Sequence, residues 1–76
     1  MTFDVVKQLI SKQFKVPETA IHEDTNIYDE LKFDSLDAVE LIIAIEEHFN
    51  LELLDSEADN VKTVHDIVKL IEKKMA

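Results

Sequence analysis

The chain has 76 residues, 46% of them apolar, which suits one small folded domain over residues 1–76. It contains neither cysteine nor glycine, and this excludes disulfides, thiolate metal sites and Gly-rich phosphate loops. Seventeen acidic residues against eight lysines give a net charge of −9, which argues against nucleic acids and anionic membranes as partners. With no long apolar run and no cleavable signal, we expect a monomeric cytoplasmic protein whose partners carry basic surfaces.

The first predicted element is an amphipathic helix that ends before Val16-Pro17, because the residue before a proline is pushed out of the helical region. Thr2 is placed to cap its start. Its apolar residues recur at helical spacing: Phe3, Val6, Leu9, Ile10 and Phe14. Residues 18–33 then lose this pattern and predict a loop of about sixteen residues, pinned by four apolar side chains: Ile21, Ile27, Leu31 and Phe33.

The second predicted helix runs from about Ser35 to Asn50. Asp34 is its expected N-cap, and Asp37, three residues later, completes an arrangement like a capping box. A short acidic stretch at 55–61 is expected to hold one or two helical turns.

Thr63 and Asp66 form a second expected capping box, at the start of the last helix. An apolar stripe follows at helical spacing: Val64, Ile67, Val68, Ile71 and Met75. No segment alternates like a strand. The sequence therefore predicts an all-α fold, a small four-helix bundle of three main helices and a short third helix, with a long loop between the first two.

The second helix carries apolar residues on two sides. One side is the expected core stripe: Ala38, Leu41, Ile42, Ile45 and Phe49. Three others lie nearly opposite and are interleaved with glutamates: Leu36, Val39 and Ile43. These three are either more core, in a helix packed on several sides, or a docking surface for a basic groove. Since a carboxylate is rarely buried unpaired, the neighbouring Glu40 and Glu47 favour docking.

Residues with catalytic chemistry do not assemble into a recognisable site. The histidines His22, His48 and His65 are far apart in the chain, and none has a partner at the spacing of a metal-binding helix. Ser35 stands out by position, because the unpaired N–H groups and positive dipole of a helix start favour a phosphate ester on its oxygen. It has no evident activating base, so a functional Ser35 would need another protein to activate it.

The segment 34–37, Asp-Ser-Leu-Asp, followed by Val-Glu-Leu at 39–41 and Ala-Ile-Glu-Glu-His-Phe at 44–49, is similar to the acyl carrier proteins. The similarity extends over nearly the whole chain. It implies that a phosphopantetheinyl transferase attaches 4′-phosphopantetheine from coenzyme A to Ser35, with Asp34 and Leu36 completing the motif. It also implies that acyl groups are held as thioesters on the arm and presented to acyl-transferring and chain-extending enzymes, while the protein itself catalyses nothing. The arm supplies the sulfur that a chain without cysteine lacks.

The resemblance also assigns docking roles on the second helix. It matches acidic recognition positions to Asp34, Asp37, Glu40, Glu46 and Glu47, and exposed apolar contacts to Leu36 and Ile43. Val39 shares that side of the helix, which periodicity had already separated from the core stripe.

Three positions depart from the family pattern. Lys32 stands where a glycine is common, Phe33 where fatty-acid carriers often have alanine, and Leu54 where a proline often precedes the third helix. The pathway therefore stays open between fatty-acid synthesis and a related polyketide or specialised-lipid pathway. The alternative function is an unmodified acidic helical adaptor or inhibitor that binds a basic groove, in which Ser35 has no role.

Overall fold

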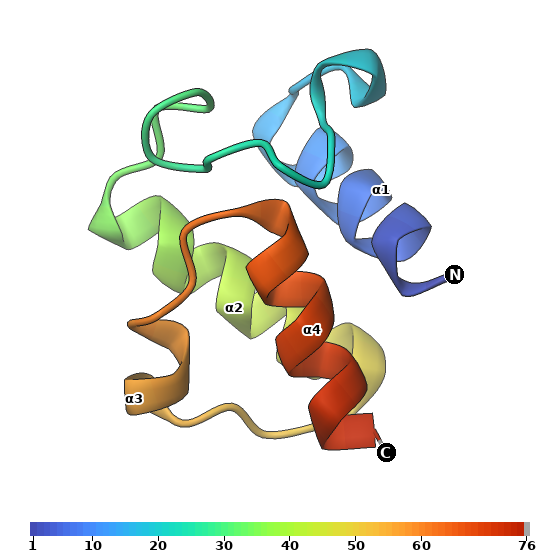
Figure 1. The fold of residues 1–76 in the computed structure, drawn as a ribbon, viewed down its shortest axis with the longest axis vertical. Helices are drawn as coiled ribbons and strands as arrows, with labels where there is room; N and C mark the ends of the chain where they lie inside the picture. The colour runs from blue at the N-terminus through green and yellow to red at the C-terminus, as the bar shows by residue number, and fades with distance from the viewer. Residues whose placement is uncertain (76) are drawn as a thin grey trace.

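The computed structural model describes residues 1–75 and is all-α, as predicted (Figure 1). In chain order the elements are α1 (Thr2–Phe14), a 3₁₀ turn (Glu18–Ala20), α2 (Ser35–Phe49), α3 (Asp55–Ala58) and α4 (Val64–Met75). Over the described range the only β-type pairing is an isolated bridge between Asn26 and Thr63. No helix in this range has the length and apolar character needed to cross a membrane.

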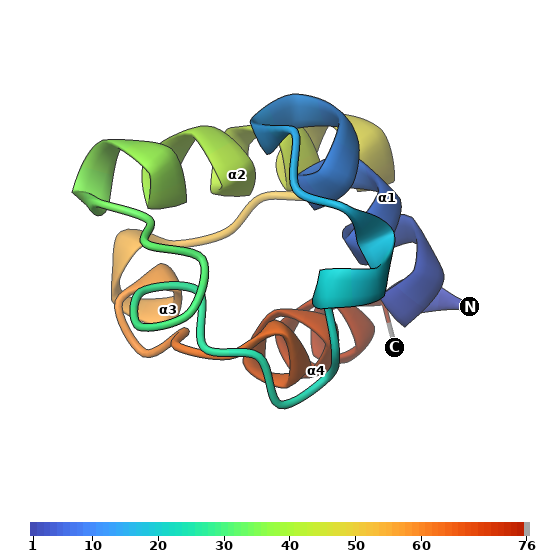
Figure 2. The same ribbon diagram turned by 90° about the horizontal axis from the view of Figure 1, so that it is seen from above.

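The helices enclose one apolar core. α1 packs against both α2 and α4, and Figure 2 shows the short α3 between α2 and α4 at the end away from α1. Each main helix contributes its predicted stripe, and the most deeply buried residues of these helices are Val6, Ile10, Leu41, Ile45, Val64, Ile67 and Ile71. Met75, predicted to extend the stripe of α4, is instead 60% exposed, because it lies in the last turn beyond the core.

The long loop before α2 is fastened to the start of α4. The Ile27 N–H donates to the carbonyl of Lys62 at 2.9 Å, and the Val64 N–H donates to the carbonyl of Thr25 at 3.0 Å. Of the four apolar side chains predicted to hold this loop, Leu31 is partly buried and three are buried: Ile21, Ile27 and Phe33. Thr25 is also buried, and its hydroxyl accepts from the His22 N–H at 2.8 Å, a contact that the sequence pattern did not reveal.

The predicted caps are confirmed at two helices and wrong at one. α4 begins with the expected box, in which the Thr63 N–H donates to Asp66 Oδ2 at 3.1 Å and the Asp66 N–H donates to Thr63 Oγ1 at 3.2 Å. Hydrogen bonds from the backbone of Lys62 and then of Thr63 lower the pKa of Asp66. Thr2 is not a cap, because α1 begins one residue earlier than expected and Met1 occupies the N-cap position.

Three residues with a Cβ adopt left-handed backbone, where glycine would be least strained. They are Lys15, Lys32 and Asn50, with φ of 59°, 60° and 54°. Lys32 is the position at which the family pattern suggested glycine, and its φ supplies the physical reason, because Cβ crowds the following carbonyl in this conformation.

Replacing Lys32 by glycine is expected to stabilise the fold. Glycine relieves the strain of the left-handed backbone, but it also loses more chain entropy on folding than lysine does. The net effect is a rise in the free energy of unfolding of up to about 1 kcal/mol. A Tm rise of roughly 4 °C in thermal unfolding would follow. The control is Lys69→Gly in the exposed middle of α4, which should cost about 1 kcal/mol. Equal destabilisation by both substitutions would contradict a left-handed Lys32.

Candidate functional site

The start of α2 is held by the predicted capping box. The Asp37 N–H donates to Asp34 Oδ1 at 2.9 Å, and the Asp34 N–H donates to Asp37 Oδ2 at 3.2 Å. Asp34 has extended backbone, and its carbonyl accepts the first intrahelical bond, from Ala38, at 3.1 Å. This arrangement makes Ser35 the first residue of the helix and leaves it exposed, with its hydroxyl outside the cap.

The local geometry fits a phosphate ester on the Ser35 oxygen. The first four N–H groups of a helix lack intrahelical partners except through caps, and here the cap takes that of Asp37. The N–H groups of Ser35 and Leu36 therefore remain at a helix end whose dipole is positive. An anionic group attached to the Ser35 oxygen is therefore favoured at this helix end. Because Ser35 is exposed, another protein can reach its hydroxyl.

The three apolar residues opposite the core stripe of α2 are on the surface. Leu36 is 63% exposed, Val39 53% and Ile43 47%, so the interpretation that they are core is wrong. Glu40 and Glu47 beside them are exposed as well. We call this surface the outer face of α2, and it comprises Leu36, Val39, Glu40, Ile43 and Glu47.

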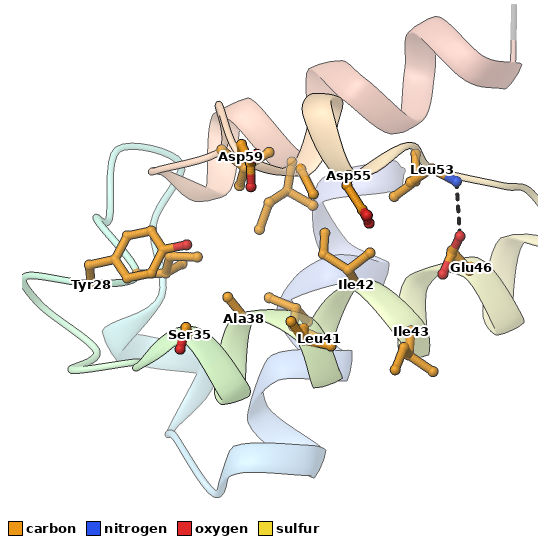
Figure 3. Close-up of a pocket in the computed structure, with 15 residues that line it drawn as sticks. Tyr28, Ser35, Ala38, Leu41, Ile42, Ile43, Glu46, Leu53, Asp55 and Asp59 are labelled. Carbon is orange, nitrogen blue, oxygen red and sulfur yellow. Dashed lines mark hydrogen bonds between the residues drawn. The ribbon is translucent and has the colours of Figure 1, made fainter.

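Glu46 differs from the other acidic residues expected to dock. It is partly buried, and its Oε2 accepts from the Leu53 N–H at 2.9 Å, the bond drawn in Figure 3. Asp37 is likewise half-buried and engaged in the cap. Both carboxylates therefore hold local structure, a role that spacing in the sequence did not indicate for Glu46.

A cleft of about 550 Å³ opens beside Ser35, between α2, α3 and the loop that carries Tyr28 (Figure 3). Its wall is mostly aliphatic, with Ile42, Leu53, Ala58, Val61 and Ile67 among the lining residues. In Figure 3, Ile42 from α2 and Asp55 from α3 point toward one another across it, while Ser35 and Tyr28 lie together at one end. The cleft could therefore shelter an apolar chain that starts near Ser35.

The α3 wall of the cleft is held in place by Glu57. Its Oε1 lies 2.8 Å from Lys74 Nζ of α4 and accepts from the Leu54 N–H at 3.0 Å. These two contacts, the Lys74 hydrogen bond first, lower the pKa of Glu57. Leu54 has φ of −78°, which a proline could also adopt, but a proline would lose the N–H that Glu57 binds. Leu54 therefore makes a contact that a proline in its place could not make.

The histidines do not form a metal site. His22, His48 and His65 are all exposed. His65 Nδ1 lies 3.6 Å from Glu23 Oε1, and no set of three potential metal ligands occurs among residues 1–75.

Comparison with known proteins agrees with this geometry. Residues 4–71 match the family model described as "Phosphopantetheine attachment site". The acyl carrier protein of Clostridium acetobutylicum is 44% identical over 71 residues, which cover 93% of this chain and 92% of that protein. Those of Wolinella succinogenes and Helicobacter hepaticus are each 41% identical, over 70 and 71 residues, with 92% and 93% of both chains covered.

The fold, the exposed helix-start serine and the family match together define a carrier domain that bears a phosphopantetheine arm. The chain belongs to the acyl carrier proteins. It is a carrier and not an enzyme, and its cofactor is 4′-phosphopantetheine, whose terminal thiol holds acyl groups as thioesters.

Proposed function

We propose that residues 1–76 form a single, free-standing carrier domain in which Ser35 is the attachment residue, with Asp34 and Leu36 as its motif neighbours. The observation that carries this proposal is the capping box, which leaves Ser35 exposed at the first position of α2 beside an apolar cleft. The competing function from the sequence is an unmodified acidic adaptor. In an adaptor, an exposed Ser35 beside an apolar cleft would have no role.

Attachment needs a phosphopantetheinyl transferase, because no side chain within residues 1–75 hydrogen-bonds to the Ser35 hydroxyl to activate it. The Ser35 Oγ forms a bond to the phosphorus of the pantetheine side, while the diphosphate bond of coenzyme A breaks. Adenosine 3′,5′-bisphosphate leaves, and the hydroxyl proton passes to a base of the transferase. The role of this chain is to present the oxygen at a helix end that favours the new phosphodiester charge.

The intact mass of the unmodified protein, measured before and after incubation with coenzyme A and a broad-specificity phosphopantetheinyl transferase, tests this function. A gain of one phosphopantetheine is the expected result. No gain, from protein shown by circular dichroism to be folded, would overturn the proposal that Ser35 is the attachment residue.

The outer face of α2 is the proposed docking surface, with Asp37 and Glu46 at its edge. Its exposed apolar side chains among carboxylates suit a groove that is apolar at the centre and basic at the rim. The proposed partners are the transferase and acyl-transferring or chain-extending enzymes with basic docking surfaces.

Charge reversal on this face should impair docking without unfolding the protein. The double variant Glu40→Lys/Glu47→Lys is expected to lower kcat/KM of the transferase for this substrate at least about tenfold, since complementary charge steers encounter. Glu18→Lys/Glu72→Lys changes the net charge equally, at exposed positions off α2, and should retain most of the rate. Equal losses in the two double variants would show that net charge, and not this face, is recognised.

The proposed cargo is an acyl intermediate of fatty-acid synthesis, with a related polyketide or specialised-lipid pathway as the second possibility. The aliphatic wall of the cleft supports an acyl chain as the guest. A monomer in the cytoplasm, as expected from the sequence, is part of this proposal.

A further inference from the structure

The wall of the cleft is poor in hydrogen-bond donors. Ten of its fifteen lining residues are aliphatic, and the polar ones are Tyr28, Ser35, Glu46, Asp55 and Asp59. The carboxylate oxygens of the three acidic side chains accept hydrogen bonds and do not donate them. Ser35 loses its O–H when the arm is attached, so the hydroxyl of Tyr28 is then the one side-chain donor on this wall.

The backbone of Tyr28 is fixed by the turn that contains it. Asn26 Oδ1 accepts from the N–H groups of Tyr28 and Asp29, each at 2.9 Å. The Asn26 N–H donates to Glu30 Oε2 at 2.8 Å, and the preceding Ile27 is 1% exposed in the core. The place from which the Tyr28 side chain extends toward the cleft is therefore set by its loop before any guest arrives.

The hydroxyl of Tyr28 is available to a guest. The side chain is 38% exposed, and no hydrogen bond from its hydroxyl occurs within residues 1–75. In Figure 3 its ring extends from the loop toward the cleft with the hydroxyl leading, at the end where Ser35 lies. A donor at this place would face the arm or its cargo, because both start from Ser35.

We propose that Tyr28 is a specificity-determining residue that favours acyl chains with a second carbonyl oxygen, such as 3-oxoacyl chains, over saturated ones. This inference rests on the proposed attachment at Ser35. A carbonyl oxygen only accepts hydrogen bonds, so the carboxylates of the cleft cannot bind it and Tyr28 can. A saturated chain contacts the aliphatic wall equally well and leaves the Tyr28 hydroxyl to water.

The test compares two cargoes on two proteins. Wild type and Tyr28→Phe are each loaded by the transferase from hexanoyl-coenzyme A or 3-oxohexanoyl-coenzyme A, loading is verified by intact mass, and Tm is measured. Tyr28→Phe keeps the ring and removes only the hydroxyl. If the Tyr28 hydroxyl donates one hydrogen bond to the 3-oxo oxygen, Tyr28→Phe removes that bond only in the 3-oxohexanoyl form. The substitution should therefore lower the Tm of the 3-oxohexanoyl form by about 4 °C more than the Tm of the hexanoyl form.

A second readout follows the oxygen itself. With ¹³C at the 3-oxo carbon, loss of the hydrogen bond in Tyr28→Phe should move the carbonyl resonance relative to wild type. Ile42→Val trims the aliphatic wall and keeps the hydroxyl, so it should shift the Tm of both loaded forms alike.

Equal Tm shifts for the two cargoes in Tyr28→Phe, or an unmoved carbonyl resonance, would overturn the assignment of Tyr28 while leaving the attachment at Ser35 intact. Absence of the mass gain in folded wild type would instead overturn the proposed function, and the role of Tyr28 with it.

Discussion

Replacing Ser35 by alanine is expected to abolish the mass gain on incubation with coenzyme A and the transferase. The new phosphodiester bond needs the Ser35 Oγ, and alanine offers no oxygen. The fold should be retained, because the capping box is made by Asp34 and Asp37 and Ser35 takes no part in it. Circular dichroism and Tm of the variant should therefore match wild type while modification falls to background.

Two other serines supply matched controls. Ser56 lies exposed on α3, and Ser11 lies half-buried on α1. Ser56→Ala and Ser11→Ala should each still gain one phosphopantetheine. A mass gain retained in Ser35→Ala but lost in either control would place the attachment elsewhere and contradict the proposed site.

Replacing Phe33 by alanine is expected to lower the free energy of unfolding by about 3 kcal/mol, from loss of buried area and a residual cavity. Phe33 is 7% exposed, and its ring centroid lies 4.4 Å from that of Phe14 in α1. A domain of this size has a total stability of roughly 4–11 kcal/mol, so the loss is a large part of it. Urea unfolding monitored by circular dichroism measures the change.

Leu36→Ala is the control for Phe33→Ala. Leu36 is also next to the capped helix start but is 63% exposed, so its truncation should change stability by less than about 0.5 kcal/mol. If both truncations have the same small effect, the packing of Phe33 on Phe14 contributes nothing. Alanine is common at position 33 in fatty-acid carriers, and the structure shows that here the phenylalanine joins the pre-helix loop to α1.

Much of the fold could be predicted from neighbouring residues. The stripes of α1, α2 and α4 and the capping pairs Asp34–Asp37 and Thr63–Asp66 each involve residues a few positions apart, which a helix brings together by its own geometry. Ser35 was found in the same way, from its place behind a cap. The glycine that is common at the place of Lys32 came from the resemblance alone, and the left-handed backbone of Lys32 gives its physical reason.

The predictions from helical spacing and capping preference were wrong at two helix ends, the start of α1 and the end of α4. Thr2 has the chemistry of a cap, but α1 already begins at Thr2, and Met1 occupies the N-cap position. Met75 fits the spacing of the α4 stripe, but the core ends before it. Helix ends depend on what the rest of the chain covers, and the pattern of one helix carries no information on that.

The sequence by itself determined the helices, the capping boxes of α2 and α4 and a serine at a helix start, because these follow from contacts within a turn or two of the chain. Only the tertiary structure decided that Leu36, Val39 and Ile43 are exposed, since this depends on which side of α2 the other helices cover. It also brought together groups from different elements: Glu57 of α3 contacts Lys74 of α4, and Tyr28 of the loop and Ser35 of α2 line one cleft. Such contacts arise from the packing of whole elements, so the pattern along any one element does not reveal them.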